Sequence, residues 1–131
     1  MHCQTGKDYR RHQYPKDFSN LIYSYVENHE DEDEVTGWIS KQLLTLGTLA
    51  LEGFIFGSFL INTKSANDVD LAILVSINDL KNEIQMFETL KQSFYVEFSK
   101  VLHLKVFNFN ENRLFNSFKT NIIFIRELDI A

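Results

Sequence analysis

Two aspartates and a glycine–serine pair are the residues of this chain whose types and spacing could do chemistry. Gly57 and Ser58 end one apolar run, and Asp68 and Asp70 open the next. Because side chains alternate along a strand, the two carboxylates would share one face of a sheet, where they repel each other unless a cation lies between them. Mg²⁺ prefers such oxygen ligands and takes further ligands from water and substrate phosphates. The spacing therefore predicts a divalent-metal site.

The glycine–serine pair predicts the phosphate-binding part of the same site. Gly57 permits close backbone approach, and Ser58 can open a helical turn whose amide groups receive a phosphate. Lys64, in the polar segment that follows, is a further candidate for a phosphate contact. The competing interpretation is plain turn chemistry, in which Asp68 caps its own backbone and Ser58 is a helix N-cap and nothing more.

Hydrophobic periodicity indicates the elements that must position these residues. We predict helices at 17–28, 35–49, 79–99 and 111–118, and strands at 53–57, 69–75, 101–109 and 122–127. The acidic run between Glu27 and Glu34 is predicted as a solvated loop between the first two helices, with Thr36 as N-cap of the second. This order predicts an α+β fold, a small mixed sheet with helices packed against it. We expect residues 1–34 to form an N-terminal extension (basic start, one helix, acidic loop) and residues 35–131 the functional domain.

Composition limits the classes of function. A chain of 131 residues with 44% hydrophobic residues is long enough for the core of one domain. A net charge of −5 argues against a broad basic surface for nucleic acid. The lone Cys3 gives no internal disulfide framework, no apolar stretch approaches the roughly 20 residues of a membrane span, and no secretory signal opens the chain. A cytoplasmic protein without membrane partners is the expectation.

A family resemblance agrees with this interpretation. Gly57-Ser58, nine intervening residues and Asp68-Val69-Asp70 resemble the signature of the DNA polymerase beta-like nucleotidyltransferase superfamily. The "NDVDLAILV" and "IIFIRE" segments, the size and the element order are similar to those of its smallest members, the minimal nucleotidyltransferases. The resemblance covers roughly residues 35–127 and implies a nucleotidyltransferase-like fold.

The chain departs from the family pattern at two places. Members that transfer nucleotides usually carry a third carboxylate on the strand after the long helix, and His103 stands at the matching position, followed on the same face by Lys105. A neutral imidazole could ligate a metal or act as a base, but it could equally be a structural residue. The usual basic residue after glycine–serine is also absent. A triad of Ser58, His103 and an aspartate is conceivable, but nothing in the spacing supports it.

The resemblance implies Mg²⁺- or Mn²⁺-dependent transfer of a nucleoside monophosphate from a nucleoside triphosphate, by default ATP, to an acceptor hydroxyl. Asp68 and Asp70 would bind the metal, Gly57, Ser58 and Lys64 the phosphates, and His103 would complete the catalytic set. Because so short a chain leaves little room for an acceptor, a homodimer or a small helical partner is expected. The alternative is a catalytically inactive nucleotidyltransferase fold that serves as a nucleotide-binding or protein-interaction module.

Overall fold

The computed structural model describes the backbone of residues 18–130 and the side chains of residues 30–130. Its elements are α1 (Phe18–Leu44), β1 (Ala50–Phe56), α2 (Ser58–Ile61), β2 (Asp68–Val75), the 3₁₀ turn η2 (Lys81–Glu83), α3 (Ile84–Phe98), β3 (Val101–Phe107), the 3₁₀ turn η3 (Phe109–Glu111), α4 (Asn112–Thr120) and β4 (Ile125–Glu127). The four strands of the described chain form one mixed sheet in the order β3-β2-β1-β4. The predicted α+β class is confirmed.

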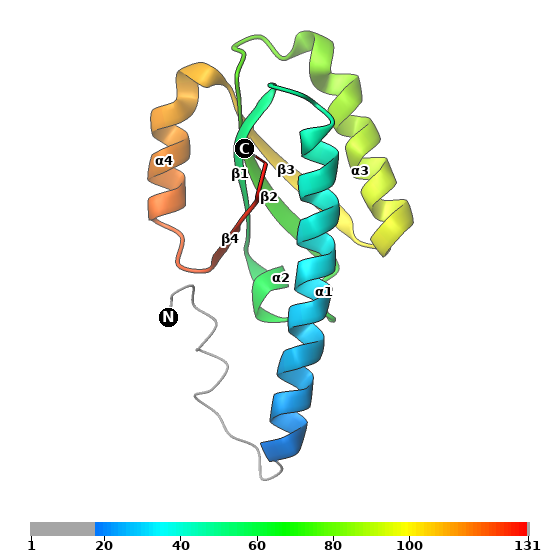
Figure 1. Ribbon diagram of the computed structural model, residues 1–131. Helices are drawn as coiled ribbons and strands as arrows, with labels where there is room; N and C mark the ends of the chain where they lie inside the picture. Colours follow the sequence, from blue (N-terminus) through cyan, green and yellow to red (C-terminus); the bar gives the residue numbers. More distant parts are fainter. Residues whose placement is uncertain (1–17, 131) are drawn as a thin grey trace.

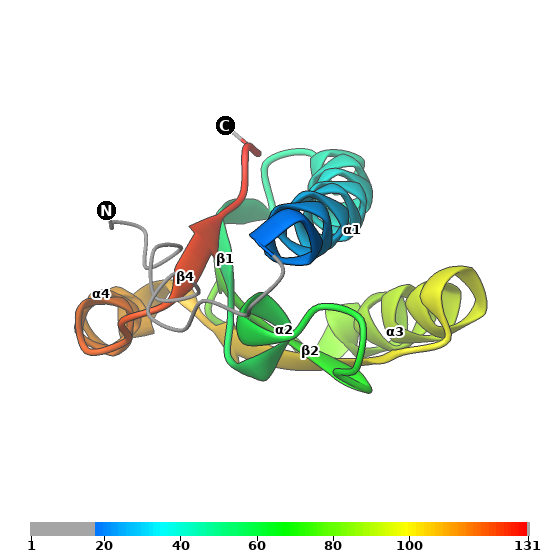
Figure 2. The same ribbon diagram turned by 90° about the horizontal axis from the view of Figure 1, so that it is seen from below.

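Helices cover both faces of this sheet (Figures 1 and 2). β1 pairs antiparallel with β2 and with β4, whereas β2 and β3 run parallel and are joined through α3. α1 and α3 lie on one face, and α4 lies on the other, as the view along the sheet in Figure 2 shows. A parallel pair needs a crossover connection of this kind, which explains why a long helix stands between β2 and β3.

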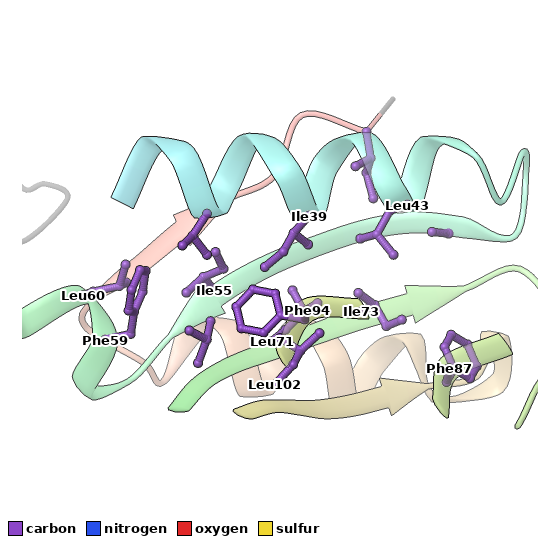
Figure 3. Close-up of a cluster of buried hydrophobic side chains, with 14 of the residues drawn as sticks. Ile39, Leu43, Ile55, Phe59, Leu60, Leu71, Ile73, Phe87, Phe94 and Leu102 are labelled. Carbon is purple, nitrogen blue, oxygen red and sulfur yellow. The ribbon is translucent and has the colours of Figure 1, made fainter. Parts of the chain in front are cut away.

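The larger core fills the space between the sheet and the helices α1 and α3. Its residues from α1 pack onto the side chains of β1, β2 and β3 that point to the same face, and Phe87 and Phe94 of α3 belong to the same cluster (Figure 3). Ile39, Ile55, Leu71 and Phe94 are fully buried there. A smaller aromatic core on the opposite face lies under α4 and includes Phe54, Ala72, Leu74, Phe107 and Phe115.

The predicted acidic loop is wrong, because α1 runs without interruption through that segment. Glu32 is buried and accepts a hydrogen bond of 2.6 Å from Arg126 Nη1 on β4, while Arg126 Nη2 lies 2.8 Å from Asp33. One acid of the run thus belongs to the buried stripe of the helix, with Val35 and Ile39 one and two turns further on. The ion pair with Arg126, which is distant in the sequence, offsets the cost of burying the Glu32 carboxylate.

Thr36 is correspondingly not an N-cap. It lies inside α1, where its hydroxyl donates a hydrogen bond of 2.6 Å to the carbonyl of Glu32. The expected division of the chain at residue 35 stays a prediction, although α1 passes through that point. The basic start of the chain, with Cys3, lies outside the described residues.

The other predicted elements are present with shifted ends. The long helix is divided into η2 and α3, and it ends at Ser99, which adopts the left-handed conformation (φ 55°). The last strand is shorter than predicted, since β4 begins at Ile125. Within the part of the chain that the structure describes, no helix combines the length and apolar character needed to cross a membrane.

Candidate functional site

The register of the sheet brings the predicted site residues onto one face. Asp70 on β2 stands opposite His103 on β3 and opposite Phe56 on β1, and Asp68 stands opposite Val101. Residues paired across neighbouring strands point to the same side of a sheet. This is the face that α4 covers further along the strands, so the site lies beside the aromatic core.

His103 lies between the two carboxylates. Its Nδ1 atom is 3.3 Å from Asp70 Oδ1 and 3.6 Å from Asp68 Oδ2. The predicted placement of His103 beside both aspartates is confirmed. Its side chain is 57% exposed, against 42% for Asp68 and 32% for Asp70, so the cluster is open to solvent.

The contact with Asp70 fixes how the imidazole can be used. A carboxylate oxygen accepts hydrogen bonds, so the contact of 3.3 Å with Asp70 Oδ1 is made by the tautomer of His103 that carries its proton on Nδ1. In the neutral ring the lone pair is then on Nε2. A base held in one tautomer by a carboxylate is the usual arrangement of a proton acceptor in enzymes.

Gly57 makes the close approach that its position predicted. Its backbone has φ 87° and ψ −161°, a region that is essentially restricted to glycine. A Cβ atom at this position would lie 2.5 Å from Asp70 Oδ2. The turn after β1 therefore rests directly against the carboxylate of β2, and no other residue type leaves Asp70 where it is.

Ser58 begins the short helix α2, as predicted, and its side chain is exposed. No side-chain capping bond is made at the start of this helix. Within residues 30–130, the Ser58 hydroxyl has no hydrogen bond to His103, so the geometry offers no support for a serine–histidine–aspartate triad. The hydroxyl faces solvent one residue after the glycine that touches Asp70.

Lys64 lies in different surroundings. It lines a cavity of about 290 Å³ together with Asp31 and Glu34 of α1 and with Lys100, and neither site aspartate lines that cavity. A second cavity of about 260 Å³, between α1 and α3, also excludes both aspartates. The structure thus adds no support for Lys64 as a phosphate contact.

The two carboxylates are the side chains of this cluster that could hold a hard cation. In the described part of the chain no group of three histidine, cysteine or acidic side chains is arranged to hold a metal ion. Two carboxylates on one sheet face do suit Mg²⁺, which keeps several waters and binds through one or two carboxylates plus substrate phosphates. The imidazole adds no negative charge, so the cation would depend on a phosphate ligand for much of its affinity.

Sequence and structure comparisons identify no relative. No protein-family model, curated protein or solved structure matches the chain.

Proposed function

We propose that the chain is a minimal metal-dependent nucleotidyltransferase that moves a nucleoside monophosphate from a nucleoside triphosphate, ATP by default, to an acceptor hydroxyl. The observation that carries the proposal is the cluster of Asp68, Asp70 and His103 with Gly57 pressed against Asp70. The spacing of the glycine–serine pair and of the aspartates, which resembles that of the polymerase beta-like superfamily, supports the same assignment.

In this proposal each side chain has a distinct task. Asp68 and Asp70 hold a Mg²⁺ or Mn²⁺ ion, which when bound offsets the charge of the phosphates and polarises them. Ser58 and the backbone at Gly57 bind the phosphates. The acceptor hydroxyl oxygen bonds to the α-phosphorus, the bond from that phosphorus to the bridging oxygen breaks, and pyrophosphate leaves with the electron pair. Nε2 of His103 takes the hydroxyl proton while Asp70 orients the ring.

The lack of a carboxylate at position 103 favours a second candidate function, an inactive nucleotidyltransferase fold that binds nucleotide or a partner protein. Phosphoryl transfer depends mainly on charge stabilisation, and this site contributes one negative group fewer than the family pattern. The two candidates differ in one respect. Only the enzyme breaks the bond between the α- and β-phosphates.

The open surface of the site supports the expected partner. His103, Asp68 and Asp70 are 57%, 42% and 32% exposed, so the cluster leaves room for groups from another chain beside it. We propose that a second copy of the chain or a small helical protein supplies the missing wall.

The test is the release of pyrophosphate together with transfer of label. The full chain is incubated with each of the four nucleoside triphosphates, labelled at the α-phosphate, with Mg²⁺ or Mn²⁺ and an extract of protein and RNA as acceptor. Matched reactions contain His103→Ala and the Asp68→Asn, Asp70→Asn double variant. Equal amounts of pyrophosphate and transferred label, lost in both variants, are expected.

Three results separate the candidates. Transfer that survives in His103→Ala contradicts the role of the imidazole. Metal-dependent nucleotide binding without pyrophosphate release contradicts the enzyme and favours the inactive module. The absence of both binding and release would overturn the nucleotide assignment altogether.

A further inference from the structure

We propose that Lys105 is the phosphate-binding cation of this site and takes the place of the basic residue that is missing after Gly57-Ser58. The inference rests on the proposed function, since it assigns a contact within the same nucleotide site. The inference is based on the position, the charge and the surroundings of the Lys105 side chain. The sequence pattern places Lys105 on the same face as His103 but assigns no function to it.

Lys105 lies next to the site on the same sheet face. It follows His103 by two residues on β3, so their side chains point the same way and their Cα atoms are roughly 6 to 7 Å apart. Its neighbour on β2 is Ala72, the residue two after Asp70. Since alanine offers only a methyl group, no large side chain of β2 stands beside Lys105.

Two aromatic rings hold the charged end of the side chain. The ammonium nitrogen is 5.4 Å from the centre of the Phe118 ring and 5.5 Å from that of Phe107. Such contacts attract the cation through the ring quadrupole but leave its N–H groups available for hydrogen bonds. The side chain is exposed, so a ligand can reach it.

Several other cations among the described residues are held by oxygen acceptors, which Lys105 is not. Lys119 and Arg126 are each held by two carboxylates, Lys91 by Glu88, and Lys100 by the main-chain carbonyl of Ala66. Within residues 30–130, no carboxylate pairs with Lys105. A lysine that has no carboxylate partner within residues 30–130, on the same sheet face as the two aspartates, is available to receive a phosphate.

The two parts of the face complement each other. The aspartates repel phosphate unless a metal ion lies between, whereas Lys105 attracts phosphate directly. A triphosphate could therefore bridge the metal side and the lysine side of the cluster. Lysine acts in such sites as a point charge with three donors, and the aromatic support limits the freedom that binding must remove.

The experiment measures the affinity of ATP and of inorganic tripolyphosphate by calorimetry in Mg²⁺, for the wild type, Lys105→Met and Lys105→Arg. Methionine keeps an unbranched stem over the rings without the charge. Lys91→Met is the matched control, because it removes a lysine from α3 on the opposite face of the sheet. Melting temperatures without ligand report the fold, and Lys105→Gln replaces Lys105→Met if that variant melts lower.

We expect Lys105→Met to lower the affinity for both ligands by about tenfold or more. Lys105→Arg should retain most of the wild-type affinity, and Lys91→Met should bind as the wild type. Wild-type affinity in Lys105→Met overturns this inference and leaves the proposed function standing. A loss confined to ATP, with tripolyphosphate unaffected, also overturns it, because the contact would then be to the nucleoside. A wild type that binds neither ligand contradicts the proposed function as well.

Discussion

Gly57 and Asp70 touch across neighbouring strands so closely that a methyl group on the glycine would stand 2.5 Å from Asp70 Oδ2. The carboxylate is the mobile end of a side chain, so an added methyl would turn it aside rather than break the sheet. The hydrogen bond from His103 to Asp70 would be lost with it. Gly57 thus sets the position of a candidate metal ligand through contact alone.

Gly57→Ala should therefore weaken metal-dependent nucleotide binding at a moderate cost in stability. We expect a loss of about 2 kcal/mol from backbone strain and at least tenfold weaker binding of ATP in Mg²⁺. Gly47→Ala is the control, because Gly47 also has positive φ (66°) but nothing within 4 Å of its Cβ position. It should cost about 1 kcal/mol and leave binding unchanged. Equal binding by the two variants would contradict the role of Gly57.

The buried acid of α1 should matter more to stability than its exposed neighbour. Glu32→Ala leaves Arg126, which is 28% exposed, without its nearest carboxylate, and we expect a loss of about 2 to 4 kcal/mol in the free energy of unfolding. Asp33→Ala removes a 52% exposed partner of the same arginine and should cost less than about 1 kcal/mol. Urea unfolding of both variants checks this, and a larger loss in Asp33→Ala would refute it.

Lys119 makes the stability of the fold depend on pH in the alkaline range. Burial alone would lower its pKa, but hydrogen bonds to Glu127 and Glu52, at 2.6 and 2.7 Å, and the charges of both outweigh it, so the pKa is raised above 10.5. Because the pKa of Lys119 is higher in the folded than in the unfolded state, the protonated lysine stabilises the fold. This contribution is complete below pH 10.5 and is lost as the pH rises through the pKa of the folded state.

The stability difference between the wild type and Lys119→Met should accordingly be largest near neutral pH and shrink above about pH 10.5. Urea unfolding at several alkaline pH values measures it. Lys81→Met corrects for the general effect of losing a surface lysine. A difference that stays constant or grows with pH is incompatible with the pair of glutamates holding Lys119 charged.

Much of the site could be predicted from local sequence. The alternation in "DVDLAILV" gives both the strand and the shared face of Asp68 and Asp70. His103 was assigned to the site through the family resemblance, and the parallel pairing of β2 with β3 brings it opposite Asp70. Gly57 was identifiable because only glycine permits so close an approach. These features depend on strand periodicity and on turn chemistry. Both are determined by a few residues that are neighbours in the sequence.

The acidic segment could not be predicted in the same way. Glu32 is buried through Arg126, which lies 94 residues later in the chain, and a dense run of acids gives no local sign of such a partner. The aromatic contacts of Lys105 also depend on residues distant in the sequence, because Phe118 belongs to α4, which follows β3 after a turn. Periodicity placed Lys105 on the correct face, but the two rings under its ammonium group follow only from the packing of α4.

The most direct test of the metal-bridged nucleotide site is the affinity of ATP measured by calorimetry in Mg²⁺ and in EDTA. Wild-type protein should bind in Mg²⁺ and lose at least tenfold in affinity in EDTA, because Asp68 and Asp70 then repel the phosphates. The Asp68→Asn, Asp70→Asn double variant should fold normally and show no gain from Mg²⁺. A double variant of exposed carboxylates elsewhere, Glu88→Gln with Asp129→Asn, should bind as the wild type. Equal affinity of the wild type in EDTA and in Mg²⁺ would contradict the account.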